Sequence, residues 1–262
     1  EFSAADDTVS VGGTSVSDTL FSYSADSLTG LTVDGGAGND NIQSSSSSIP
    51  VVLAGGEGND KLTGGSADDE INGDAGNDTV NGRGGDDSLF GGAGDDVIAG
   101  GAGNDVIDAG SGDDVLRGQG GLSNILDGGA GTDVVAERGD VNFILTDSSL
   151  TSSLFADSSK IIESLVSIES AILRGGAGDN TLDASAFTGD VRLVGLGGND
   201  LLIGGIGDDI LRGNNGDDTM IGNAGDDFAI AGKGNDGLAG GIGNDKLNGN
   251  KGDDTIFGGD GS

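Results

Sequence analysis

Aspartate recurs every nine residues in two stretches of this chain, as the last residue of a Gly-Gly-x-Gly-x-Asp sequence or of a close variant of it. One clean copy, Gly91 to Ala99, is followed without a gap by a second, Gly100 to Asp108. A fixed short period predicts one small unit stacked many times, which places these carboxylates in rows of like charge that need a counter-ion. The spacing therefore indicates cation binding, and the aspartates concerned are Asp40, Asp60, Asp69, Asp78, Asp87, Asp96, Asp105, Asp114, Asp133, Asp200, Asp209, Asp218, Asp227, Asp236, Asp245 and Asp254.

The type of cation follows from the ligands that the sequence offers. The chain contains no histidine and no cysteine, so a site built here is all-oxygen and does not favour zinc or copper. Two stacked carboxylates and the carbonyls of glycine-rich loops suit a hard cation with six to eight oxygen ligands. Magnesium prefers a rigid octahedron with several waters, so the sequence favours calcium.

Each nonapeptide divides into a six-residue turn, ending at the aspartate of position 6, and a three-residue strand with a large aliphatic residue at position 8. Alternating side chains let only the middle strand residue point inward. Two strands and two turns then make a coil of 18 residues, and strands of successive coils stack in parallel. Position 5 is almost always Asn or Asp, as at Asn77 and Asp95, which we assign to turn geometry and not to metal ligation.

The repeats resemble those of the RTX (hemolysin-type calcium-binding) family of bacterial secreted proteins. That resemblance implies a parallel β-roll, calcium between stacked loops, and type I secretion to a secreted, extracellular or cell-surface location. It also implies that the aspartates above are side-chain ligands and that flanking residues supply main-chain carbonyls. The glycines expected in that second role are Gly56, Gly58, Gly92, Gly94, Gly101, Gly103, Gly205, Gly207, Gly241 and Gly243.

Several places depart from the period. Asp40 lies 20 residues before Asp60, and Asn180 lies 20 before Asp200, so one half-coil in each place has eleven residues, 44–54 and 184–194. An irregular unit, 118–127, places Ser123 or Asn124 where an aspartate is expected. Counting gaps between stacked aspartates gives five and two in the first block and three and two in the second, so about 12 calcium ions.

The predicted fold is all-β: a right-handed parallel β-roll solenoid with two calcium-binding blocks joined by a metal-poor, β-rich insert. Residues 1–34 are expected to form an N-terminal cap of degenerate coils, 35–136 the first block, 137–174 the insert, and 175–262 the second block. Within the insert, 141–145 is expected to be a strand. Ile161, Leu165, Ile168 and Ile172 fit a helix face, although strands are equally compatible with that segment.

The amino-acid composition limits the classes of function that this chain can have. With 45 acidic and 11 basic residues the formal net charge is −34, so nucleic acid and anionic membranes are poor partners. No apolar stretch approaches the length of a membrane span. Without histidine neither a zinc-protease site nor a Ser-His-Asp triad can form, and we expect no enzyme activity. One inward aliphatic per nine residues makes a thin core, so we expect folding to depend on calcium.

The chain has no initiator methionine and stops within a repeat, which suggests a piece of a larger parent protein. We favour a structural, secretion-assisting folding module. One alternative is an adhesin or surface-layer segment with a cell-surface or matrix partner, since Arg138, Gly139 and Asp140 form an RGD tripeptide. A second is an ice- or crystal-binding face, which the irregular residues at position 7 disfavour.

Overall fold

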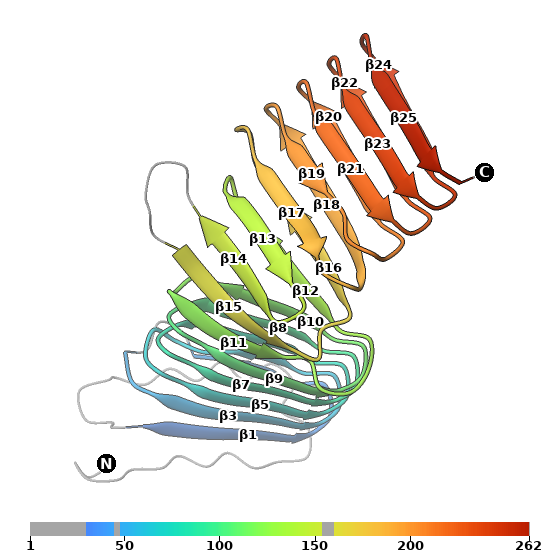
Figure 1. Ribbon diagram of the computed structural model, residues 1–262. Helices are drawn as coiled ribbons and strands as arrows, with labels where there is room; N and C mark the ends of the chain where they lie inside the picture. The colour runs from blue at the N-terminus through green and yellow to red at the C-terminus, as the bar shows by residue number, and fades with distance from the viewer. Residues whose placement is uncertain (1–29, 45–47, 154–159, 262) are drawn as a thin grey trace, which may run out of the picture. The chain divides into compact units, whose positions relative to one another are not determined.

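The computed structural model describes residues 30–44, 48–153 and 160–261. The chain divides into two compact units, Glu1–Val134 and Val135–Ser262, which we treat separately. Each is built from short strands stacked into parallel sheets (Figure 1). The all-β parallel solenoid predicted from the repeat is confirmed, with about 12 coils in the whole chain. Handedness stays a prediction.

The N-terminal unit winds alternately through two sheets, because each half-coil sends its strand to the opposite side. Parallel pairing joins every strand to the next but one along the chain. One sheet contains β1 (Leu31–Ala37), β3 (Val51–Glu57), β5 (Glu70–Ala75), β7 (Ser88–Ala93), β9 (Val106–Ser111) and β11 (Ser123–Asp127). The other contains β2 (Asn41–Gln43), β4 (Lys61–Thr63), β6 (Thr79–Gly84), β8 (Val97–Ala102) and β10 (Val115–Gln119).

The C-terminal unit repeats this winding after β12 (Val134–Arg138), which begins at the boundary. One sheet contains β13 (Asn142–Thr146), β17 (Thr181–Ala186), β19 (Leu201–Ile203), β21 (Thr219–Ala224), β23 (Gly237–Ile242) and β25 (Thr255–Asp260). The other contains β16 (Ser170–Arg174), β18 (Asp190–Gly197), β20 (Ile210–Asn215), β22 (Phe228–Lys233) and β24 (Lys246–Lys251).

The insert is β-structure throughout its described residues. β14 (Ser149–Ser153) runs antiparallel to β13 and to β15 (Lys160–Val166), so it interrupts the parallel stack with a meander. The helical alternative does not occur, because Ile161 and Leu165 lie in β15 and Ile172 lies in β16. The predicted N-terminal cap lies mostly outside the described residues, and its last residues, from Leu31 on, already pair in β1.

Most strands are longer than the three residues that the repeat predicts. Of the 25 strands in the described residues, twelve have six residues and cover positions 7, 8, 9, 1, 2 and 3, as in β6. The backbone bends at position 2 with a positive φ, yet pairing with the neighbouring coil continues through that bend. Arg83 (φ 75°) and Asp74 (φ 73°) hold this conformation without being glycine. The turn proper is therefore confined to positions 4 to 6.

The position 8 aliphatics fill the interior of the coils, as the period predicts, except in the last strands, where Leu247 is partly exposed and Ile256 is exposed. Leu62, Ile71, Leu89 and Leu202 are fully buried, and Ala229, where the aliphatic series breaks, is buried as well. The two 20-residue coils are also confirmed, since Leu31 pairs with Val51 and Thr181 pairs with Leu201. Asn124 gives a further coil of 19 residues, in which Val106 pairs with Ile125.

Candidate calcium-binding turns

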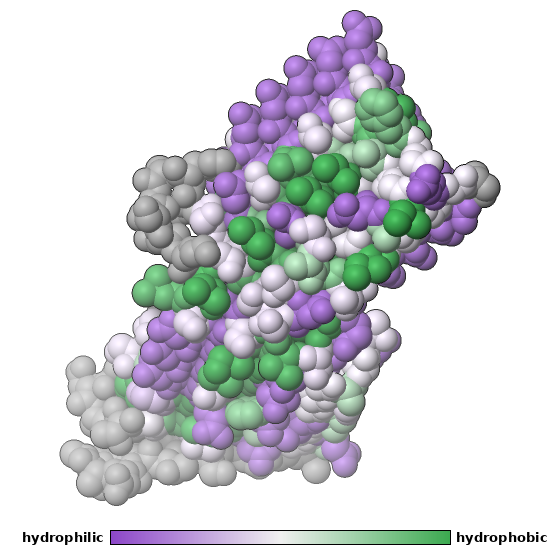
Figure 2. All heavy atoms as spheres, viewed as in Figure 1, coloured by the Kyte–Doolittle hydropathy of each residue, from purple (hydrophilic) through white to green (hydrophobic). Residues whose placement is uncertain are grey.

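The position 6 aspartates line the inside of the turns, where successive coils stack. Those from Asp40 to Asp133 and from Asp200 to Asp236 are at most 3 % exposed, while Asp245 and Asp254 are partly exposed. We use the word file for a row of position 6 side chains on one side of a roll. Figure 2 shows hydrophilic residues gathered in rows along the turns.

One carboxylate oxygen of each aspartate links two coils. Oδ1 of Asp78 accepts the backbone N–H of Asp60 at 2.7 Å, and Oδ1 of Asp96 accepts that of Asp78 at 2.7 Å. The same bond recurs along both units, for example from Asp200 N–H to Asp218 Oδ1 at 2.8 Å. Each aspartate thus closes the turn of the preceding coil.

The other oxygen is buried and has no hydrogen-bond partner in most of these residues. Buried carboxylate oxygens normally have a donor or a cation, since an unpaired one is costly. The aspartates with such an Oδ2 atom are Asp40, Asp60, Asp78, Asp87, Asp96, Asp105, Asp114, Asp200, Asp218, Asp227, Asp236 and Asp245.

Glycine at position 1 makes room for this second oxygen. A Cβ atom built on Gly55, Gly73 or Gly91 would overlap with Oδ2 of the aspartate five residues later. These glycines do not have a positive φ, so the space beside Oδ2 accounts for them and a left-handed conformation does not. Two repeats carry alanine at this position instead, Ala109 and Ala231, and both methyl groups are buried, so position 1 takes a small residue and not glycine alone.

The residues beside the irregular half-coils differ from the rest. Asp69 and Asp209 use both oxygens, because Oδ1 accepts from Val51 or Val191 and Oδ2 accepts from Gly65 or Gly205 at 2.7 Å. In these eleven-residue half-coils Val51 and Val191 occupy the place of the position 6 aspartate. The files therefore have no carboxylate in the coil before Asp69 or before Asp209.

Asparagine replaces aspartate at two file ends. Asn124 accepts the N–H of Asp105 through Oδ1 and donates from Nδ2 to the Gly120 carbonyl at 3.0 Å. Asn180 donates from Nδ2 to Asp140 Oδ1 at 3.2 Å and to the Val141 carbonyl at 3.1 Å. In both places an amide N–H finds a partner within the protein.

Burial and mutual repulsion favour protonation of the files. Desolvation is the largest cause, and it raises the pKa of Asp78 to about 6 and that of Asp87 and Asp96 to about 7. The backbone N–H that each Oδ1 accepts works in the opposite direction, and neighbouring file carboxylates raise the pKa further. Asp209 and Asp218 behave in the same way, each with a pKa of about 7.

These turns fit a calcium ion on two observations. The unpartnered Oδ2 atoms supply hard anionic oxygens in pairs along each file. Among the described residues no three carboxylates converge on one point, so a cation would need main-chain oxygens as well. Carbonyl oxygens are present in these turns, where those of Gly36 and Gly38 lie so close to Gly56 and Gly58 of the next coil that a Cβ there would overlap with them.

Comparison with known families gives the same result. The model of the RTX calcium-binding nonapeptide repeat matches residues 32–46, 52–80, 90–122 and 171–187, and overlapping segments from 194 to 262. Together these segments cover more than half of the chain. The chain belongs to the RTX calcium-binding repeat family. A comparison with curated proteins finds no match.

The RTX turns contain a second ladder, which the sequence analysis missed. Position 5 side chains accept through Oδ1 from the position 5 N–H of the following coil, as in Asn77 N–H to Asn59 at 2.9 Å and Asp95 N–H to Asn77 at 3.0 Å. Their alternation between Asn and Asp was a usable signal, because both residues carry the same Oδ1 acceptor. Position 5 is therefore an inter-coil link as well as a turn residue.

The glycines predicted to offer carbonyls fall into two groups in the RTX turns. Gly56, Gly58, Gly92, Gly94, Gly101, Gly103, Gly241 and Gly243 all have positive φ values, between 105° and 144°. Gly205 and Gly207 do not have this conformation. They stack on the irregular half-coil of residues 184–194, and Gly205 donates its N–H to Asp209.

The RGD tripeptide lies at the start of the second RTX roll. Oδ1 of Asp140 accepts the N–H of Gly178 at 3.0 Å and bonds to Asn180, so its carboxylate is held against the first turn of that roll. This contact gives Asp140 a role within the fold.

In the described residues no helix is long and apolar enough to cross a membrane.

Proposed function

We propose that this chain is a calcium-dependent folding module of a larger bacterial protein that is secreted or held at the cell surface, with a structural, non-catalytic role. RTX repeats are typical of secreted bacterial proteins, which supports an extracellular site of action. The observation that carries the proposal is the file of buried, unpartnered Oδ2 atoms on a thin aliphatic core.

The proposed side-chain ligands are the sixteen position 6 aspartates named in the sequence analysis, with turn carbonyls completing each site. Neighbouring carboxylates in a file then share a cation, and the gaps between them give about 12 ions. Bound calcium supplies positive charge at the oxygens that lack a donor. The residues themselves position it: Oδ1 bonds to the preceding coil fix each carboxylate, and position 1 leaves space for Oδ2.

Export provides the physical setting. Extracellular calcium modules bind at about 10⁻⁴–10⁻³ M, far above the free calcium of a cytoplasm. With a calcium affinity in this range the chain stays unfolded before export, because repulsion between its carboxylates opposes compaction. Calcium binding outside then contributes directly to folding free energy.

Far-UV circular dichroism of the chain in EDTA, and then with millimolar calcium, tests this proposal. We expect a disordered spectrum in EDTA and a β spectrum with calcium, while magnesium at the same concentration leaves the chain disordered. Metal analysis of the folded form should give about 12 calcium ions per chain. A full β spectrum in EDTA at neutral pH would refute the proposal.

A further inference from the structure

The charged residues on the outside of the strands are divided between the two sheets. The strands of the β1 sheet in the N-terminal unit contain six carboxylates and no lysine or arginine. We name their outer surface the acidic face, which comprises Asp34, Glu57, Glu70, Asp74, Asp108 and Asp127. The β16 sheet of the C-terminal unit has a basic face, which comprises Arg174, Arg192, Arg212, Lys233, Lys246 and Lys251.

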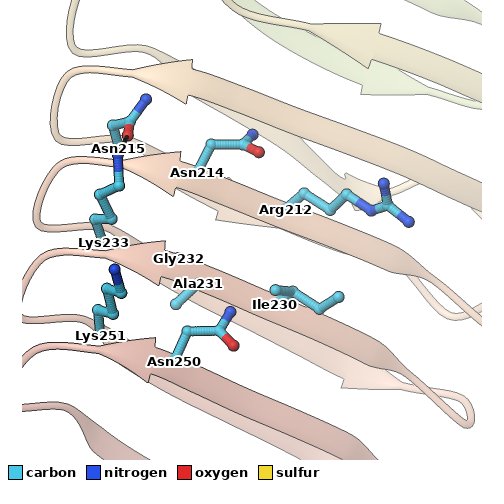
Figure 3. Close-up of a pocket in the computed structure, with 9 residues that line it drawn as sticks. All are labelled: Arg212, Asn214, Asn215, Ile230, Ala231, Gly232, Lys233, Asn250 and Lys251. Atoms are coloured by element: carbon cyan, nitrogen blue, oxygen red, sulfur yellow. Dashed lines mark hydrogen bonds between the residues drawn. The ribbon is translucent and has the colours of Figure 1, made fainter.

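This basic face is unusual for the composition. The whole chain has 11 basic residues against 45 acidic ones, and the basic face alone contains six of them, with only Asp190 opposing them on these strands. Lys233, Lys246 and Lys251 are exposed. Lys233 and Lys251 line an open hollow of about 630 Å³ over β20, β22 and β24, together with Arg212 and the amides of Asn214, Asn215 and Asn250 (Figure 3).

Both faces carry exposed apolar side chains between the charges. On the acidic face these are Val52, Phe90, Val106 and Ile125, each between 38 and 46 % exposed. On the basic face Leu196 and Phe228 are exposed. Figure 2 shows apolar patches of this kind among hydrophilic residues. Exposed apolar side chains with a charged surround are typical of protein interaction surfaces.

The two faces also share one spacing. On the acidic face, one column across the strands runs Val52, Glu70, Ser88, Val106 and Ile125. On the basic face, the corresponding column runs Ile172, Arg192, Ile210, Phe228 and Lys246. The first column contains one carboxylate, Glu70, and the second contains two cations, Arg192 and Lys246, and apolar residues fill most of the other places. Both stacks advance by one strand spacing of about 4.8 Å per strand, so the two faces present opposite charges at the same pitch.

We propose that the acidic face of one copy of this chain docks on the basic face of a second copy. The partner is another molecule of the same protein because it presents the opposite charge at the same pitch, with apolar side chains on both surfaces. This association goes beyond the proposed function, but it rests on it in one respect: the faces exist only in the folded, calcium-loaded chain.

The area of the two faces sets the expected strength of association between two copies of the chain. Six strands at about 4.8 Å spacing and six residues at about 3.3 Å each make a face of about 600 Å². A standard stable interface buries roughly 800 Å² per partner, so we expect weak association. Its charged rows make it sensitive to salt, because exposed charges are screened over about 10 Å at 0.1 M ionic strength.

Sedimentation velocity of the full chain in calcium tests the proposal. We expect the average mass to rise with protein concentration at low salt and to return to the monomer at about 0.5 M salt, where the screening length is only a few ångströms. The double variant Lys233→Glu/Lys246→Glu should be monomeric, as should Glu70→Lys/Asp108→Lys. All four residues are exposed, so both variants should keep the calcium-induced β spectrum.

Sedimentation velocity of a mixture of the two variants is the decisive experiment. The first retains the native acidic face and the second retains the native basic face, so the mixture should associate although neither variant does so alone. A control, Lys61→Glu/Arg117→Glu, makes the same change of charge on the other sheet of the N-terminal unit and should associate as the unchanged chain does.

Monomeric behaviour of the unchanged chain at low salt, or association that survives Lys233→Glu/Lys246→Glu, would overturn the inference. Circular dichroism on the same samples separates this failure from that of the proposed function. A chain that folds with calcium and stays monomeric contradicts only the docking. A chain that never responds to calcium contradicts the folding proposal.

Discussion

Asn77 and Asp78 are adjacent in sequence and bond to opposite neighbours. Oδ1 of Asn77 accepts the N–H of Asp95 in the following coil, and Oδ1 of Asp78 accepts the N–H of Asp60 in the preceding one. The pair thus ties three coils together through side-chain oxygens of one turn. The same Oδ1 bonds work for Asn or Asp, but only Asp78 also presents a buried second oxygen without a donor.

Asp96→Asn should lower the amount of bound calcium by one or two ions of about 12, because Asp96 borders two gaps of its file. The amide keeps the Oδ1 that accepts from Asp78 and removes the charge. Asp95→Asn is the matched control, since it removes the same charge at position 5 and keeps the acceptor for Asp113. Metal analysis and calorimetric titration measure both; equal calcium loss in the two variants would contradict position 6 ligation.

Without calcium the roll should be more stable in acid than at neutral pH. The folded pKa of Asp87, Asp96, Asp209 and Asp218 is about 7, above the ordinary 3.8, so the folded state binds more protons between these values. The free energy of unfolding is then highest below about pH 4 and falls as pH rises through 6 to 7. Circular dichroism in EDTA should show more β-structure at pH 4 than at pH 8.

The affinity for calcium should depend on pH in the opposite direction from the stability of the calcium-free roll. Protons compete with the cation for the same carboxylates, so the calcium concentration needed for folding should rise as pH falls below about 7. Calcium titrations at pH 8, 7 and 6 measure this shift. A midpoint that is constant over this range would show that the file carboxylates are not the groups that bind.

Gly234→Ala should impair folding far more than Gly237→Ala. Gly234 has a φ of 136°, and a Cβ there would overlap with the Gly216 carbonyl of the preceding coil. The nearest neighbour to a Cβ on Gly237 is the Thr219 hydroxyl at 4.0 Å, so alanine fits there. We expect Gly234→Ala to lower the melting temperature of the calcium form, while Gly237→Ala leaves it unchanged or raises it slightly.

Leu89→Ala should cost about 2–5 kcal/mol of unfolding free energy, because it empties a fully buried position 8 site. Phe90→Ala is the adjacent control, and its side chain is 38 % exposed on the outer face. Thermal unfolding in calcium measures both variants. A larger loss for Phe90→Ala would mean that the inward and outward positions of β7 are wrongly assigned.

The period predicts those features of the fold that depend on register. Coil length, parallel pairing, the inward aliphatics such as Leu89 and the two 20-residue coils all follow from where position 6 falls. The antiparallel β14 could not be predicted, because the insert has no period and its apolar runs fit helix and strand equally. The continuation of pairing through position 2 was missed because a positive φ at Asp74 or Arg83 is not evident from composition.

The candidate site was predicted in part. The sequence indicates which aspartates gather, since nine-residue spacing brings them to the same side of a stack. It does not show that Oδ1 is already occupied by the preceding coil, nor that a small residue at position 1 leaves space beside Oδ2. Both depend on atomic packing between coils. Ligand identity and the number of ions stay predictions, which metal analysis can decide.

On the proposed calcium ligation, Asn124 and Asn180 mark where a row of cations would end. Each exchanges the unpartnered oxygen of an aspartate for an N–H that bonds to the protein itself. On that proposal, one atom type at one position would decide whether a coil requires metal or is complete without it. The metal capacity of such a chain, and with it the calcium level at which it becomes rigid, can change by single Asp-to-Asn substitutions while the backbone path stays the same.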